Sequence, residues 1–130
     1  MRFLLLFSFS FLIGGTFSQA AEHTKDSLET VQKNLKDGKA ILLDVREESE
    51  WDDGHLKDAK LLPLSKIKEG VKEEELKKLL AKDKVIYCHC AAGGRCLKAA
   101  EALAKLRYEV KPLKPGYQDL LKAGFAPAAK

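Results

Sequence analysis

The chain has 130 residues, of which 45% are hydrophobic and 32% are charged, and its formal net charge is +4. This balance is typical of one ordinary globular domain and excludes an intrinsically disordered chain. The lysines are interspersed with glutamate and aspartate, and no basic stripe alternates with aromatic residues. Nucleic-acid binding therefore has no support from the composition.

The N-terminal segment predicts a secretory signal peptide. Arg2 is followed by an almost wholly apolar run over residues 3–17. The small residues Ser18 and Ala20 then occupy the two positions that a signal peptidase reads. The apolar run is short for a membrane span, although an uncleaved anchor is the alternative interpretation.

We therefore expect residues 1–20 to be removed and residues 21–130 to form a single domain. Cleavage lowers the formal net charge from +4 to +3, because Arg2 is the one charged residue in the removed segment. The mature protein is expected to be periplasmic or secreted and to have no stable association with a membrane.

Helices and strands are predicted to alternate along the rest of the chain. Residues from Asp26 to Glu29 have the pattern of a capping box. The run over residues 40–45 is continuously apolar except at Asp44, as in a strand that is buried on both faces of a parallel sheet. The expected elements are, in chain order, a helix from residue 28 to about residue 36, strands over 40–45 and 59–62, a helix over 73–81, a strand over 85–88, a helix over 96–106, a strand over 110–113 and a helix over 117–122.

This order predicts an α/β fold, in which a mainly parallel open sheet carries helices on both faces, because parallel strands need crossover connections. Small residues in the helix over 96–106 suit close packing against the sheet. We expect four of its residues to face inward: Leu97, Ala100, Leu103 and Ala104.

The most informative stretch runs from Cys88 to Cys96 and joins an apolar strand to this Ala-rich helix. Ligands bind at the carboxyl ends of strands in α/β sheets. A helix N-terminus and a nearby cation, here Arg95, lower the pKa of a cysteine. Cys90 is thus the candidate nucleophile, and Gly93 and Gly94 allow the unusual dihedrals of a loop whose backbone amides cradle an anionic sulfur.

Three clustered cysteines allow a second interpretation. An odd number of cysteines within nine positions is not a disulfide scaffold, although a bridge between two of them is possible. Cys88, Cys90 and Cys96 could also bind a soft metal together with His89, or serve thiol redox chemistry. A strand directs Cys88 and His89 to opposite faces, however, and no second cluster completes a tetrahedral set.

The loop and its surroundings resemble the single-domain rhodaneses, the thiosulfate sulfurtransferase family. Cys90, Gly93 and Arg95 have the spacing of that family's active loop. Other segments are similar to the family in the same order, so that the resemblance covers about residues 28–125. These segments are Asp44-Val45-Arg46-Glu47, Glu50-Trp51, Gly54-His55-Leu56, Ala59, Leu62-Pro63-Leu64, Pro115-Gly116-Tyr117 and Ala123-Gly124-Phe125.

The resemblance implies a three-layer rhodanese-like fold and an enzyme that carries sulfur as a persulfide on Cys90. Its partners would be a small-molecule donor such as thiosulfate and a cyanide or thiol acceptor, without a metal or an organic cofactor. A non-catalytic interaction module of the same fold is the alternative, although such modules typically lack the loop cysteine. The expected substrate-binding loop consists of Ala91, Ala92, Gly93, Gly94, Arg95 and Cys96.

Spacing and composition refine the predicted chemistry. Four residues separate Cys90 from Arg95, whereas related phosphatases have five, so the shorter ring favours sulfur over phosphate. Ala91 and Ala92 stand where the family often has basic or hydroxyl residues, which puts thiosulfate in doubt as the physiological donor.

Several nearby residues have two possible roles. Arg95 can orient an anionic donor, pair with a carboxylate, or do both. Asp44 and Arg46 are supporting candidates, for which a structural ion pair and a substrate contact are equally plausible. His55 and Trp51 are expected to pack rather than to react. For Cys96 we favour packing at the start of the helix over a disulfide with Cys90.

Overall fold

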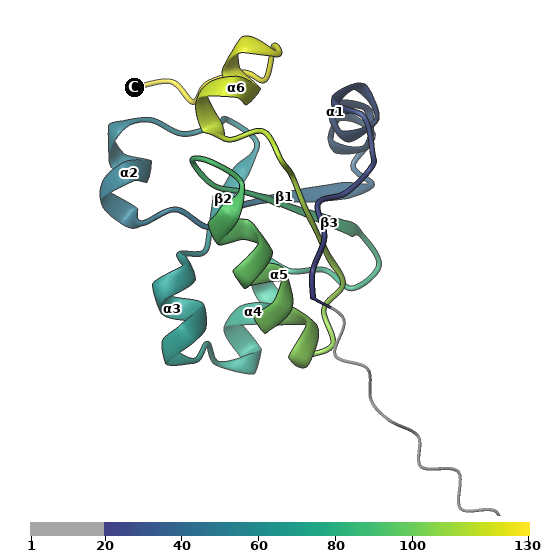
Figure 1. Cartoon of the computed structure of the whole chain (residues 1–130), viewed down its shortest axis with the longest axis vertical. Coiled ribbons are helices and arrows are strands. Elements are labelled where there is room, and N and C mark those ends of the chain that lie inside the picture. The colour runs from purple at the N-terminus through teal and green to yellow at the C-terminus, as the bar shows by residue number, and fades with distance from the viewer. Residues whose placement is uncertain (1–19) are drawn as a thin grey trace, which may run out of the picture.

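The computed structural model describes residues 20–130, which form a four-stranded parallel sheet with helices on both faces (Figure 1). The strands are β1 (Ala40–Asp44), β2 (Ala59–Leu61), β3 (Val85–His89) and β4 (Val110–Pro112), and their order in the sheet is β2-β1-β3-β4. All three neighbouring pairs are parallel. The predicted fold class is confirmed.

Helices cover the sheet in two groups. In Figure 1, α3 (Leu64–Glu69), α4 (Glu73–Leu79) and α5 (Gly94–Lys105) lie below the sheet, and α1 (Leu28–Lys36) and α6 (Tyr117–Lys122) lie above it. The short helix α2 (Glu48–Asp53) follows β1 along the chain. The predicted signal segment lies, apart from Ala20, outside the described residues. Within residues 20–130, no helix is long and apolar enough to cross a membrane.

The two faces of the sheet have separate cores because alternate residues of a strand point to opposite faces. The core on the α3–α5 face includes Leu43, Ile86, Leu103 and all three cysteines. The opposite core includes Leu42, Tyr87 and Leu120. The sulfur-bearing side chains thus lie on one face of the sheet.

Two short helices were not predicted. The six residues of α2 include none that is buried, and α3 has only Leu64 and Ile67 in the core. Neither helix is long enough to show a helical hydrophobic period, which needs a window of about 11 or more residues. Helix α4 also ends two residues earlier than predicted, at Leu79.

The buried face of α5 differs by one position from the prediction. The helix starts at Gly94, and its buried residues have the i, i+3, i+4, i+7 spacing of one helical face. Ala104 is exposed and Leu97 is only half-buried. The buried residues of α5 are Cys96, Ala99, Ala100 and Leu103.

The start of α1 is capped by Ser27 rather than Asp26. The Ser27 hydroxyl accepts a hydrogen bond from the Thr30 amide at 3.1 Å. The Asp26 carboxylate instead accepts from the Tyr87 hydroxyl at 2.7 Å and lies 3.4 Å from the ammonium of Lys111. Asp26 therefore joins the start of α1 to β3 and β4.

Candidate functional site

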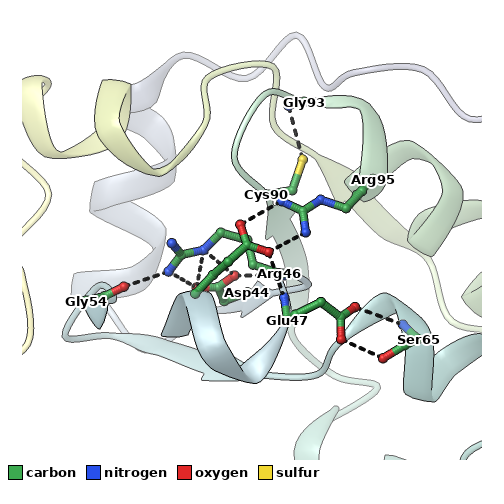
Figure 2. Close-up of polar contacts among 9 residues, drawn as sticks. Asp44, Arg46, Glu47, Gly54, Ser65, Cys90, Gly93 and Arg95 are labelled. Atoms are coloured by element: carbon green, nitrogen blue, oxygen red, sulfur yellow. Dashed lines mark hydrogen bonds and ion pairs between the residues drawn. The ribbon is translucent and has the colours of Figure 1, made fainter. Parts of the chain in front are cut away.

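The loop from Cys90 to Gly93 connects the carboxyl end of β3 to the start of α5 (Figure 2). Gly93 has a φ of +88°, a left-handed conformation that favours glycine. Its amide donates a hydrogen bond to the Cys90 Sγ at 3.1 Å. Cys90 is fully buried beneath the loop. The predicted turn of the backbone over the sulfur is therefore present in the structure.

Gly94 does not share the conformational role that we predicted for it. It is the first residue of α5, and it is not among the glycines with positive φ. The glycine that the loop requires besides Gly93 is Gly116. Its backbone packs so closely against the loop that a Cβ there would overlap the carbonyl of Ala91. The next amide, that of Tyr117, donates to the Cys90 carbonyl at 2.9 Å. The turn before α6 therefore supports the loop from outside.

The thiol environment differs from the one expected. The neighbouring Cys96 thiol and burial raise the pKa of Cys90, although the backbone amides of Cys96 and Ala92 act in the opposite direction. The predicted lowering is therefore wrong for the resting thiol. The physical reason is that the sulfur is fully buried beside another thiol, while the guanidinium of Arg95 is already paired.

Cys96 is held by hydrogen bonds. Its thiol lies 3.1 Å from the Gly93 carbonyl oxygen and 3.3 Å from that of Leu113, to which it can donate. The Cys88 thiol and burial raise the pKa of Cys96 to about 12. Cys88 in turn donates to the Cys96 carbonyl at 3.4 Å. All three cysteines are free thiols.

Arg95 makes a two-pronged ion pair with Glu50 of α2. The two guanidinium nitrogens lie 2.6 and 2.9 Å from the two carboxylate oxygens. Glu50 also accepts a hydrogen bond from the Glu47 amide at 3.2 Å. The bond from Arg95 is the main cause that lowers the pKa of Glu50 to about 2. Of the roles considered for Arg95, the one seen in this geometry is the ion pair with a carboxylate.

Asp44 and Arg46 form a buried ion pair at the end of β1. Two Arg46 nitrogens bind the Asp44 carboxylate at 2.8–3.1 Å, and the Arg46 amide binds it at 3.0 Å. The guanidinium also donates to the Gly54 carbonyl at 2.8 Å and lies 4.2 Å from the centre of the Tyr117 ring. Side-chain exposure is 0% for Asp44 and 5% for Arg46, so the geometry favours the structural role.

Two histidines lie near these strand ends. His89 is fully buried and lies 3.8 Å from Asp44, and burial lowers its pKa. In the described part of the chain, neither ring nitrogen of His89 has a hydrogen-bond partner. The ring of His55 stacks on Trp51 with centroids 3.5 Å apart, and its Nδ1 contacts the Trp51 carbonyl at 2.9 Å. His55 therefore packs, as predicted.

A hollow of about 280 Å³ opens beside the loop. Ala91 and Ala92 are exposed at the crest of the loop, so this side of the site is apolar. The other walls bring charged and aromatic groups from the segment after β1, from α2 and from α6. The hollow is lined by Arg46, Glu50, Asp53, Gly54, Ala91, Tyr117 and Gln118.

The structure thus brings the predicted loop together with partners that the sequence analysis did not identify. Glu50 belonged to a recognised segment but had no assigned role, and Gly116 and Tyr117 were noted without one. His23, which contacts the Gly93 carbonyl at 2.7 Å, carried no sequence signal. Within residues 20–130, no three or more His, Cys, Asp and Glu side chains are grouped so that they could hold a metal ion.

Comparison with known proteins identifies a family for most of the chain. A family model described as "Rhodanese-like domain" matches residues 27–123. The chain is 36% identical over 81 residues to the uncharacterized protein YqhL of Bacillus subtilis, a match that covers 62% of this chain and 60% of that protein. The chain therefore spans less than two thirds of the length of this relative.

Solved structures have the same fold. A rhodanese-related protein from Thermoplasma volcanium matches with a TM-score of 0.63 and 26% identity, covering 78% of this chain and 94% of that one. The human single-domain sulfurtransferase TSTD1 matches with a TM-score of 0.64 and 24% identity, covering 75% and 94% of the two chains. At that identity, the human structure shows the fold alone.

Proposed function

This chain belongs to the rhodanese-like domain family, and we propose that it transfers a sulfane sulfur through a persulfide on Cys90. The observation that carries the proposal is the hydrogen bond from the Gly93 amide to the Cys90 Sγ. The backbone turns over the buried sulfur and donates an amide to it, an arrangement that a merely structural buried cysteine does not require.

The first half of the reaction forms the persulfide. The Cys90 sulfur attacks the outer sulfur of the donor, and with thiosulfate the sulfur–sulfur bond of the donor breaks. Sulfite leaves with the thiol proton, and the enzyme keeps the negative charge on the terminal sulfur. Because the resting thiol has a raised pKa, this proton departs during the reaction and not before it.

The second half returns the enzyme to its starting state. A nucleophilic acceptor such as cyanide attacks the terminal sulfur, the sulfur–sulfur bond of the persulfide breaks, and thiocyanate leaves. The Cys90 thiolate then takes up a proton. Backbone amides around the loop stabilise both anions.

The surroundings of the loop favour a sulfur donor whose binding does not require an unpaired cation. Both guanidinium groups beside the hollow are paired, Arg95 with Glu50 and Arg46 with Asp44. Asp53 adds a further carboxylate to the lining. We therefore propose that thiosulfate is a usable but weakly bound donor, and that a persulfide or a thiol-bound sulfane sulfur binds better.

Intact-protein mass spectrometry tests the proposal. Incubation with thiosulfate should add one sulfur, about 32 mass units, to the wild type and to Cys88→Ser, and none to Cys90→Ser. Addition of cyanide should remove the added mass and release thiocyanate. A wild-type protein that gains no sulfur from thiosulfate or from a small-molecule persulfide would contradict the proposed function, and a persulfide found on Cys88 would contradict the assignment of Cys90.

A further inference from the structure

The segment that precedes α1 runs alongside β4 (Figure 1). We call residues 21–24 the N-terminal strap. The Thr24 amide donates to the Pro112 carbonyl of β4 at 2.8 Å. The Ala21 amide donates to the Glu101 carboxylate of α5 at 3.2 Å. The strap is thus attached both to the sheet and to the helix that follows the active loop.

Between these two attachments, His23 reaches the active loop itself. Its Nε2 lies 2.7 Å from the Gly93 carbonyl oxygen. A carbonyl can only accept a hydrogen bond, so Nε2 carries the proton and donates it. Gly93 is the residue whose amide donates to the Cys90 sulfur. His23 therefore holds one end of the residue whose other end contacts the reacting atom.

Gly93 needs this support because of its own chemistry. A glycine populates both signs of φ readily, so its left-handed conformation is not fixed by a side chain. Its carbonyl receives two donors, the His23 imidazole at 2.7 Å and the Cys96 thiol at 3.1 Å. Fixing the carbonyl restricts the rotations by which the amide could turn away from the sulfur.

We propose that His23 is a positioning residue for the sulfur-carrying loop, and that it acts by holding the Gly93 carbonyl so that the Gly93 amide points at Cys90. This inference rests on the proposed function, because it assigns to the strap a part in stabilising the anionic forms of Cys90. It places a residue from outside the loop, 70 positions before Gly93, in control of the thiol.

The alternative is that His23 only fastens the N-terminal segment to the domain. A purely structural contact would change the thermal stability and leave the ionisation of Cys90 unchanged. The pH midpoint of Cys90 alkylation by iodoacetamide separates the two roles. The midpoint follows the formation of the thiolate, whereas a change in reagent access alone changes the rate by the same factor at every pH. Peptide mass spectrometry distinguishes Cys90 from the other two thiols.

The decisive variants are His23→Ala and His23→Gln in the full chain expressed from Met1. The side-chain nitrogen of glutamine stands the same number of bonds from Cβ as Nε2 does, so it can restore the donor. We expect His23→Ala to raise the alkylation midpoint by about one pH unit, a partial loss of a hydrogen bond to a charged sulfur. The kcat for sulfur transfer should fall about three- to tenfold, and the KM for thiosulfate should stay within about twofold.

His23→Gln should return the midpoint and kcat at least halfway to the wild-type values. Glu22→Ala is the matched control, since Glu22 is the exposed neighbour of His23 in the same strap. If His23→Ala does not fold, a comparison of His23→Gln with His23→Asn replaces it, because the asparagine side chain is one bond too short to reach the Gly93 carbonyl. A wild-type midpoint and kcat in His23→Ala, or in both His23→Gln and His23→Asn, would overturn the inference.

Failure of the inference can be told from failure of the proposed function. Alkylation needs no sulfur donor. If the alkylation midpoint shifts in His23→Ala and the wild type transfers no sulfur, the result supports the positioning role of His23 and contradicts the proposed activity. Active sulfur transfer with an unchanged midpoint in His23→Ala supports the activity and contradicts the positioning role of His23.

Discussion

Two neighbouring strands, β1 and β3, end side by side, and the segments that follow them are stabilised in opposite ways. At the end of β1, the buried Asp44 carboxylate accepts hydrogen bonds from the Arg46 guanidinium, which also donates to the Gly54 carbonyl. After β3, backbone amides and the Cys96 thiol lie around the Cys90 sulfur, and within residues 20–130 no charged side chain makes a hydrogen bond to it. Charge fixes the end of β1, whereas the loop offers neutral donors, which suit the negative charge that develops on sulfur in the proposed reaction.

One ion pair joins the two segments. Arg95 belongs to the first turn of α5, and Glu50 belongs to α2 after β1. Their contacts at 2.6 and 2.9 Å join the two segments, and Glu50 also lines the hollow. The comparison therefore predicts that changes at the end of β1 affect stability most, that changes at the Arg95–Glu50 pair affect activity, and that changes among the thiols other than Cys90 affect neither strongly.

The largest effect on stability is expected from Asp44→Asn. This variant leaves the Arg46 guanidinium buried without its counter-charge, and breaking a buried pair from one side typically costs about 3–5 kcal/mol. Urea unfolding followed by circular dichroism should show this loss as a much lower midpoint.

Glu73→Gln provides the control for this prediction. It removes the exposed pair with Lys77 on α4 and should leave the midpoint nearly unchanged. If Asp44→Asn were as stable as the wild type, the end of β1 would not depend on charge, and the contrast between the two segments would disappear.

The contrast also explains what could be predicted from the sequence. The apolar run of β1 and the spacing of Cys90, Gly93 and Arg95 are local patterns, so the sheet and the loop followed from short stretches of chain. The partners of that loop are distant in sequence: Glu50 lies 45 positions before Arg95, and His23 lies 70 positions before Gly93. No periodicity or spacing rule encodes such contacts, because they depend on how the helices pack.

The raised pKa of Cys90 was unpredictable for a related reason. The sequence places Arg95 five residues after the thiol, which suggests a free cation nearby. Only the tertiary structure shows that Glu50 neutralises this cation and that the Cys96 thiol lies beside Cys90. The electrostatic environment of a loop therefore requires knowledge of every element around it.

A second, smaller effect is expected at the Arg95–Glu50 pair. If Arg95 acts by holding the loop to α2, Arg95→Lys and Glu50→Gln should each lower kcat/KM for thiosulfate by about tenfold, because lysine cannot reproduce the two-pronged geometry. Their double variant should be no worse than either single variant. A Glu50→Gln protein with a lower KM for thiosulfate would instead show that Arg95, once released, binds the anionic donor.

The same pair predicts a pH dependence of stability. The pKa of Glu50 is lowered from 4.5 to about 2, so its ionised form stabilises the fold fully above pH 4.5, and this stabilisation is lost as the pH falls toward 2. Solvent screens the pair because both side chains are about one-third exposed, so the effect is modest. Wild type should be more stable than Glu50→Gln above pH 4.5, and the two should converge near pH 2 in urea unfolding. A difference that persists at the acid end would assign the stabilisation to another group.

A still smaller effect is expected for Cys96→Ser. Serine keeps a donor for the Gly93 carbonyl. In the wild type, the Cys96 thiol lies 3.1 Å from the Gly93 carbonyl oxygen and 3.3 Å from that of Leu113, so these contacts hold it away from the persulfide. Activity should remain within about twofold of wild type. Peptide mapping of air-oxidised wild type should show no disulfide between Cys90 and Cys96. Finding that disulfide, with activity restored by a reductant, would make the two thiols a redox pair.

The smallest effect concerns the start of the mature chain. Cleavage after Ala20 would place a free α-ammonium on Ala21, whose nitrogen lies 3.2 Å from the Glu101 carboxylate, and so convert a hydrogen bond into an exposed ion pair. We expect N-terminal sequencing of the exported product to begin at Ala21 and Glu101→Gln to lower its Tm by only about 1–2 °C. Glu109→Gln, at an exposed residue outside the strap, should lower the Tm less. A product that retains Met1 and remains in the membrane fraction would show that the N-terminal apolar run anchors the protein, and the Glu101 contact would then be made by an ordinary peptide amide.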